Sequence, residues 1–323
     1  MDRRRFVVGT AATALAAGAA SAQEVFPARP VTIINAFPPG GLNDIVTRPL
    51  AAALEPILKQ PVVIDTKAGA AGQVGAQVAA TARPDGYSLL SHNVGISGYA
   101  EVDKLFGRPV KVSRADFIPL ARIIADPILF LVNDQQPYKT LKEFIDGAKA
   151  KPDTLVFSSG GLYGASHLPL AYLERATGPL KLRHLPTSGG GPAITAILGN
   201  NAQVSAQSVG ATLAHVKAGK LRPLASFGGK RSKVLPDVPT LKELGYDVEY
   251  YLWVGMFAPK DTPPAIVATL REAIGKAVQS EKFTAALANA GQELAYLDGP
   301  DFQKFWDVDG KRTDEAVIAI GRQ

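Results

Sequence analysis

The chain has 323 residues, of which 46% are hydrophobic and 20% charged, and its net charge is +6. This composition is that of a globular protein large enough for two α/β lobes with separate cores. It holds no basic run with interleaved aromatic residues, so we expect no nucleic-acid partner. The absence of cysteine excludes disulfides, thiol nucleophiles and thiolate metal sites.

The first 22 residues have the pattern of an export signal. Arg3-Arg4-Arg5 precedes an Ala/Gly-rich apolar stretch, Val7–Ala20, and the small residues Ala20-Ser21-Ala22 suit a cleavage site. The paired arginines resemble a twin-arginine signal. The apolar stretch is shorter than the ~20 residues that a membrane anchor needs. We therefore expect residues 1–22 to be a signal peptide cleaved near Ala22, and the mature protein to be periplasmic.

The segment from Val31 to Arg48 predicts a strand, a Gly-rich turn and a helix in succession. Its β-branched and apolar residues up to Phe37 are typical of a buried strand. Pro38-Pro39-Gly40-Gly41 cannot extend that strand, and Asn43 or Asp44 can cap the helix that follows. The backbone N–H groups at such a helix start, with the helix dipole behind them, favour binding of an anion.

Two features follow in the next strand–loop–helix units. The loop Gly69–Gly75, after the strand Pro61–Asp65, has the spacing GxxGxxG instead of the dinucleotide-binding GxGxxG. We interpret it as a tight loop that packs a helix on a sheet. The strand Ser88–Ser91 ends at His92. Because loops at strand ends line clefts in open α/β sheets, His92 is a candidate ligand residue, with a structural role as the alternative.

Two hydrophobic strands, Pro127–Val132 and Tyr250–Ala258, are candidates for crossing between lobes. They place residues 23–124 and 250–323 in one lobe and residues 125–249 in the other. Strands alternate with helices along the whole chain, which predicts a mainly parallel sheet in each lobe. The fold class is therefore α/β.

Two more Gly-rich turns are similar to the first. Ser158–His167 precedes a helix that Ser166 can cap, and Thr187–Pro192 precedes a helix whose first position suits Pro192. Any one of these turns could be an ordinary connection between a strand and a helix. Three of them, in a chain with two crossing strands, indicate a cleft lined by backbone amides. Such a cleft suits a carboxylate and needs no buried arginine.

The motifs of catalysis and metal binding are missing. The sequence holds no GxSxG elbow, P-loop or HExxH, and its four histidines lack the spacing of metal ligands. Ser166 and His167 are adjacent, so on a helix they do not face each other as nucleophile and base. We therefore expect a binding protein and not an enzyme, with no catalytic residue, no cofactor and no metal.

An ordered set of short motifs spans nearly the whole mature chain and resembles the Bug (TctC-like) family, the periplasmic solute-binding receptors of tripartite tricarboxylate transporters. Each motif is weak alone, and their order is what makes the resemblance specific. The motifs are Phe26–Val31, Phe37–Asp44, Gly69–Gly72, Pro84–Tyr87, Ser166–Leu168, Gly189–Ala193, Ala218–Arg222, Leu235–Thr240 and Trp253–Pro259.

The resemblance implies a two-lobed periplasmic-binding-protein fold of type II, with a hinge between the lobes. It implies a carboxylate held by main-chain amides and ordered waters, and delivery of that ligand to the integral-membrane permease subunits. We expect a monomer. The residues and the resemblance together predict these ligand contacts: Phe37, Pro38, Gly41, Asn43, Asp44, His92, Ser158, Gly161, Leu162, Tyr163, Ser166, His167, Thr187 and Ser208.

The chain departs from the family at three places, two in these turns and one in the strand that follows them. Tyr163-Gly164 replaces a Gly followed by Ser or Thr, Thr187-Ser188 replaces a common Tyr-Lys, and Ser205 replaces an Asp. We hypothesise that Tyr163 stacks on or bounds a bulkier, aromatic acid. Two other functions are open at this point: a sensory binding protein that docks on a receptor kinase, and a periplasmic enzyme on the same scaffold. Neighbouring permease or kinase genes would separate the first from transport, and turnover of a bound acid would reveal the second.

Overall fold

The computed structural model describes residues 26–322, so the predicted signal peptide lies outside the described residues. The strands are β1 (Val31–Asn35), β2 (Val62–Thr66), β3 (Ser88–Asn93), β4 (Phe117–Asn133), β5 (Val156–Ser159), β6 (Arg183–Pro186), β7 (Val204–Ser208), β8 (Leu221–Ser226), β9 (Tyr251–Pro259) and β10 (Leu294–Asp298). The α-helices are α1 (Leu42–Leu58), α2 (Gln73–Ala80), α3 (Tyr99–Leu105), α4 (Leu141–Ala150), α5 (Leu168–Thr177), α6 (Gly190–Leu198), α7 (Val209–Lys217), α8 (Pro264–Val278), α9 (Glu281–Asn289) and α10 (Gly299–Ile320). Short 3₁₀ helices are η1 (Ala70–Gly72), η2 (Val94–Gly98) and η3 (Arg114–Asp116).

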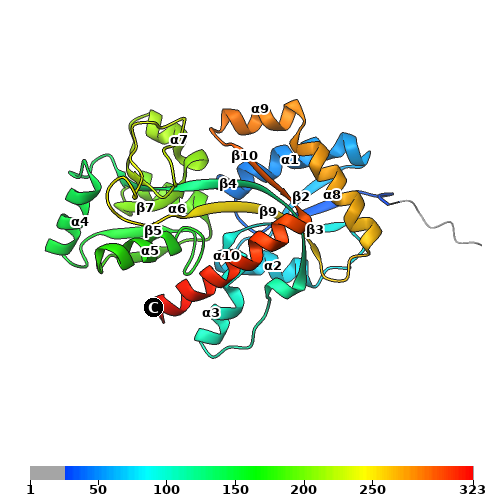
Figure 1. Ribbon diagram of the computed structural model, residues 1–323, viewed down its shortest axis with the longest axis horizontal. Coiled ribbons are helices and arrows are strands. Elements are labelled where there is room, and N and C mark those ends of the chain that lie inside the picture. The colour runs from blue at the N-terminus through cyan, green and yellow to red at the C-terminus, as the bar shows by residue number, and fades with distance from the viewer. Residues whose placement is uncertain (1–25, 323) are drawn as a thin grey trace, which may run out of the picture.

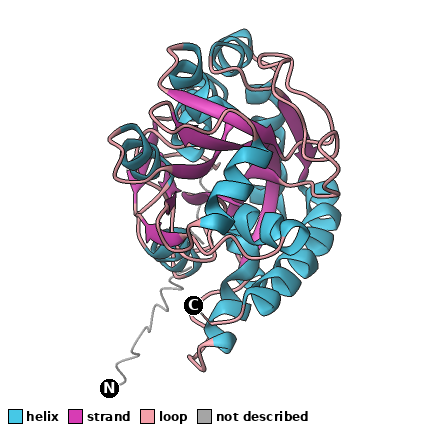
Figure 2. Ribbon diagram, turned by 90° about the vertical axis from the view of Figure 1, so that its left-hand side faces the viewer, coloured by secondary structure: helices cyan, strands magenta, loops and turns pink. Residues whose placement is uncertain are grey.

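The strands form one continuous path of hydrogen-bonded neighbours in the order β2-β1-β3-β9-β4-β7-β5-β6, and β8 and β10 also pair with β4. The outer strands are parallel, as predicted: β1 pairs in parallel with β2 and β3, and β5 with β6 and β7. The middle strands differ from the prediction, because β4 and β9 pair antiparallel with all their neighbours. The sheet is therefore mixed, and helices lie on both sides of the strands (Figure 2).

Strand β4 belongs to two groups of strands. Its residues from Phe117 to Pro127 pair with β9, and those from Ile128 to Asn133 pair with β7 and β8. We call β1, β2, β3, β9 and β10 with their helices the β1 half, and β5, β6, β7 and β8 with their helices the β5 half. Figure 1 shows them at opposite ends of β4.

The two predicted crossing strands are present, with corrections. The first is longer than Pro127–Val132, because it begins at Phe117 and passes two irregularities in register near Pro119 and Arg122 that hide its periodicity. The second, β9, pairs with β3 and β4 and with no other strand among residues 26–322. The chain crosses just before it, where the amide of Tyr250 donates to the carbonyl of Phe227.

Helix α10 starts in the β1 half and ends beside the β5 half (Figure 1). Its aromatic residues fix it on β9: the ring centroids of Trp306 and Phe257 are 4.9 Å apart, and those of Phe302 and Trp253 5.4 Å apart. At its far end the hydroxyl of Tyr163 donates a 2.6 Å hydrogen bond to the carbonyl of Gly321. None of the helices within residues 26–322 is both long and apolar enough to cross a membrane.

Candidate functional site

The three Gly-rich turns lie around one cavity between the two halves. The cavity has a volume of about 30 Å³, which is room for on the order of one or two water molecules. No lysine, arginine, aspartate or glutamate is among the described residues that line it. They are Phe37, Gly41, Leu42, Asn43, Ala71, Asn93, Gly160, Ala165, Ser166, Gly190, Gln207, Ser208 and Leu252.

The first turn brings the start of α1 to the cavity. Gly41 is the N-cap residue and no side chain caps the helix, so the prediction that Asn43 or Asp44 would cap it is wrong. Both residues lie two and three positions after the cap, inside the first turn of the helix. Asp44 instead reaches back: its Oδ2 accepts the amide hydrogen of Gly40 at 3.3 Å, and its Oδ1 is paired with Arg48 at 2.7 Å. The carboxylate therefore holds the shape of the turn and does not line the cavity.

The second turn is held from within by serine hydroxyls. Ser166 does not cap α5, whose N-cap residue is His167. The hydroxyl of Ser166 instead accepts the amide hydrogen of Gly160 at 2.7 Å, across the turn. Gly161 has a φ of +130°, and a Cβ there would lie 2.7 Å from the Cβ of Ala71 in the β1 half. Only glycine allows this close approach of the two halves.

The third turn presents the start of α6. The helix begins at Gly190, two residues before the predicted Pro192, and no side chain caps it. A Cβ on Gly41 would lie 3.3 Å from the amide nitrogen of Gly191, so the helix starts of α1 and α6 meet face to face across the two halves. Helices α2, α3, α5 and α8 also lack a side-chain cap, whereas α4, α7, α9 and α10 are capped by Thr140, Ser208, Ser280 and Asp298. The first amides of α1 and α6 have no intrahelical acceptor.

The predicted ligand residues fall into three groups. Those that line the cavity are Phe37, Gly41, Asn43, Ser166 and Ser208. Those that line a neighbouring outer pocket are Gly161, Leu162, Tyr163 and Thr187. The others, Pro38, Asp44, His92, Ser158 and His167, lie behind or beside these walls, and ligand contact by any of the predicted residues stays a prediction.

Sequence reasoning missed several lining residues. Gly190 belongs to the third turn, and Asn93 follows the predicted His92, so both could have been predicted from the sequence as lining residues. Ala71 was assigned to a packing loop. Gln207, on β7, carries no motif, and its Nε2 donates to the hydroxyl of Ser205 at 2.9 Å. Only the position of β7 beside β4 and β5 brings it to the cavity.

His92 supports the wall instead of facing the cavity. Complete burial lowers the pKa of its imidazole to about 4, so the ring is neutral at pH 7. The hydroxyl of Tyr99 lies 2.8 Å from its Nε2 and donates its hydrogen to the carbonyl of Ala71. Nε2 therefore carries the ring proton, and Nδ1 accepts the amide hydrogen of Asn93 at 2.8 Å. This network fixes the Ala71 loop beside the cavity.

His167 also lies within the protein. Its ring stacks on His184 with centroids 4.4 Å apart, and its Nδ1 accepts the amide hydrogen of Tyr163 at 3.2 Å. Burial lowers the pKa of His184 to about 4, and its Nε2 lies 2.7 Å from the hydroxyl of Ser159. These contacts stabilise the second turn. Within residues 26–322 no group of three or more His, Asp or Glu could hold a metal ion.

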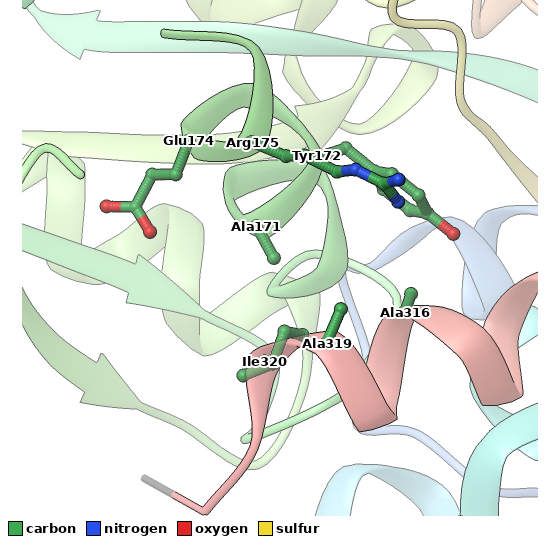
Figure 3. Close-up of a pocket in the computed structure, with 7 residues that line it drawn as sticks. All are labelled: Ala171, Tyr172, Glu174, Arg175, Ala316, Ala319 and Ile320. Carbon is green, nitrogen blue, oxygen red and sulfur yellow. The ribbon is translucent and has the colours of Figure 1, made fainter. Parts of the chain in front are cut away.

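Larger hollows lie outside the inner cavity, among them an outer pocket and a groove. The outer pocket, of about 400 Å³, is lined by Tyr99, Phe106, Arg108 and part of the second turn. A groove of about 380 Å³ lies between α5 and α10, and Figure 3 shows Tyr172, Glu174 and Arg175 above Ala316, Ala319 and Ile320. This groove is lined by residues within the helices, whose amides are used in helical hydrogen bonds. It therefore lacks the free N–H groups of the inner cavity.

The comparisons with known proteins agree on one family. Residues 46–321 match the model of the tripartite tricarboxylate transporter family receptor, TctC. The chain is 32% identical to the protein BugT of Bordetella pertussis over 90% of this chain and 89% of that one.

Solved structures give the same result. The periplasmic binding protein BugD superposes with a TM-score of 0.83 at 30% identity, covering 90% of this chain and 97% of that one. MatC from Rhodopseudomonas palustris, with bound malate, superposes with a TM-score of 0.83 at 27% identity, covering 90% of this chain and 99% of that one. The R. palustris protein Rpa4515, with adipate, superposes with a TM-score of 0.85 at 27% identity, covering 92% of this chain and 98% of that one. The α/β fold with its cavity between two groups of strands is thus the fold of these periplasmic binding proteins, and their family is one of solute-binding receptors and not of enzymes. The chain belongs to the Bug (TctC) family of periplasmic solute-binding receptors.

Proposed function

We propose that this protein captures a small organic acid, a carboxylate, through backbone amides in the cavity between its two halves. The observation that carries the proposal is the meeting of two helix starts, α1 and α6, neither of which is capped by a side chain. The aligned dipoles and free N–H groups of the two helices favour negative charge at this place.

The energy of such a site is sufficient without a cationic side chain. A hydrogen bond to a charged group contributes about 1.5–3 kcal/mol, and micromolar affinity needs about −8 kcal/mol. A handful of amides therefore suffices. The relatives solved with malate and with adipate support a carboxylate as the ligand.

The proposal requires the two halves to move apart. The inner cavity has about 30 Å³, whereas pockets for small molecules are usually roughly 300–1,000 Å³. We propose that residues 23–124 and 250–323 form one lobe and residues 125–249 the other, with the hinge where β4 changes partners after Pro127 and where the chain crosses before β9. An acid would enter the open form, and the lobes would close on it.

The proposal includes export and delivery. The leader would direct the chain to the periplasm, and the closed, monomeric form would pass its ligand to the integral-membrane permease subunits of a tripartite transporter. The matching family model, a transporter receptor, supports this part.

The test is a binding screen with a matched pair of glycine variants. Saturating ligand should raise the melting temperature of the mature protein measurably, and calorimetry against mono-, di- and tricarboxylic, amino and aromatic acids should then give its affinity. In Gly41→Ala the new methyl group meets the Gly191 nitrogen at 3.3 Å, so closure is hindered and affinity should fall at least tenfold.

Gly199→Ala is the control. Gly199 also lies at the end of a helix with negative φ, and its added Cβ also meets a nitrogen at 3.3 Å, but it is far from the cavity. Its affinity should equal that of the unchanged protein. Failure of every acid in the screen, or equal affinity in both variants, would contradict the proposal.

A further inference from the structure

The side chain of Asn43 is held in one orientation by two buried hydroxyl groups. Asn43 is 2% exposed, and Ser91 and Thr47 are fully buried. The Nδ2 of Asn43 donates to the hydroxyl of Ser91 at 3.1 Å, and that hydroxyl lies 2.6 Å from the hydroxyl of Thr47. Because Ser91 is on β3 and Thr47 one turn further along α1, this chain of hydrogen bonds ties the amide to the sheet behind it.

The other end of the same amide has no partner. The Oδ1 of Asn43 is buried and makes no hydrogen bond within the described residues. A buried acceptor left without a hydrogen bond costs about 1–3 kcal/mol. Because Asn43 lines the inner cavity, a ligand there can supply the missing donor. The site thus offers amide donors at the helix starts and one acceptor beside them.

A hydroxyl group is the donor that fits this acceptor. A carboxylate oxygen would face Oδ1 as a second acceptor, which is repulsive. An ammonium group would need a carboxylate for its charge, but none lines the cavity, and the neighbouring Asp44 is already paired with Arg48. An uncharged hydroxyl on the carbon chain of the acid satisfies Oδ1 and brings no further charge.

We propose that Asn43 makes this receptor selective for hydroxy acids over the same acids without the hydroxyl group. This inference rests on the proposed function, because it assigns one part of the ligand to one residue of the same cavity. One charge-free hydrogen bond that also satisfies a buried acceptor should give about a tenfold preference.

The experiment compares pairs of acids that differ by one hydroxyl: malate and succinate, 2-hydroxyadipate and adipate, mandelate and phenylacetate. Calorimetry on the mature protein should show the hydroxy acid of the best-bound pair binding about tenfold more tightly. Asn43→Leu should reduce that ratio to about one while the plain acid still binds. Ser91→Ala should reduce the ratio in part, because it frees the amide to turn.

Thr262→Ala serves as the control. It also removes a buried hydroxyl, but this hydroxyl donates to the carbonyl of Pro259 and does not touch Asn43. Its ratio should stay that of the unchanged protein.

Equal binding of both acids by the unchanged protein, or a preference for the plain acid, would overturn the inference and leave the proposed function intact. The second result would show that the amide is turned round, with Nδ2 toward the cavity. A protein that binds none of the six acids overturns the inference, and failure of the wider screen as well overturns the proposed function. If Asn43→Leu does not fold, the ratio of affinities for the hydroxy acid and the plain acid, measured in the unchanged protein and in Ser91→Ala, still tests the inference.

Discussion

Tyr163→Phe should weaken ligand binding without lowering the stability of the unliganded protein. Tyr163 lies in the second turn, in the β5 half, and its hydroxyl donates at 2.6 Å to the carbonyl of Gly321 at the end of α10. Because α10 is packed on β9 through Trp306 and Phe302, its end should move with the β1 half in the opening that we propose. This hydrogen bond would then form only when the two halves are together.

The expected magnitude follows from this geometry. A hydrogen bond between uncharged groups contributes about 0.5–1.5 kcal/mol, which corresponds to a dissociation constant raised roughly 2- to 13-fold. The phenyl ring of the variant keeps its contacts with Phe106 and His167, whose centroids lie 6.0 and 5.9 Å away. The packing of the loop is thus preserved, and only the bond between the halves is lost.

Calorimetry with the best acid from the binding screen, and thermal melts without ligand, test this prediction. Tyr172→Phe is the matched control, because its hydroxyl also donates to a carbonyl of α10, that of Arg312, but at 3.3 Å and in an exposed position. Its affinity should change less than twofold. Unchanged affinity of Tyr163→Phe together with a lower melting temperature would refute the reasoning, since the bond would then hold the fold together in the open form too.

Two further predictions concern carboxylates. Asp44→Ala removes the acceptor of the Gly40 amide and the partner of Arg48, so the first turn should loosen and affinity should fall several-fold with the protein still folded; calorimetry that shows unchanged affinity would remove Asp44 from the site. Asp126 is buried between Gly210 and Gln292, and desolvation raises the pKa of its carboxyl to about 7. Because the folded state then binds a proton that the unfolded state has lost, stability should fall as the pH rises from about 4 to 7, by up to about 4 kcal/mol. Urea unfolding at both ends of this range should show a smaller fall in the free energy of unfolding for Asp126→Asn, because the Oδ1 of the new asparagine can accept the same two hydrogen bonds. An equal fall in the variant and in the unchanged protein would assign the effect to other groups.

The strand–turn–helix units could be predicted well from the sequence, because the Gly and Pro residues that end each strand and precede each helix act locally. The predicted strand Pro61–Asp65 overlaps β2 (Val62–Thr66), and the predicted strand Ser88–Ser91 lies within β3 (Ser88–Asn93). The convergence of three turns on one cavity was also within reach, since parallel strands bring their carboxyl ends to one edge.

The details that failed depend on contacts between distant segments. The start of α1 at Gly41 could not be read from local preference, because the capping positions are occupied by the other half of the protein instead of a side chain. The orientation of β4 and β9 is set by pairing over more than a hundred residues of sequence. Ligand contact by His92 stays a prediction, but that its ring is enclosed could not be read from the sequence, because the enclosure depends on the positions of Tyr99 and Ala71.

The passage of β4 through both groups of strands has a mechanical consequence. A single unbroken strand that is hydrogen-bonded on either side of Pro127 resists stretching and sliding but yields to twisting. In the opening that we propose, rotation about this strand would keep the ladder hydrogen bonds on both sides of Pro127, so the same strand would guide each opening and closing. Substitutions at the rim of the cavity would then change the ligand preference without changing the direction of the motion.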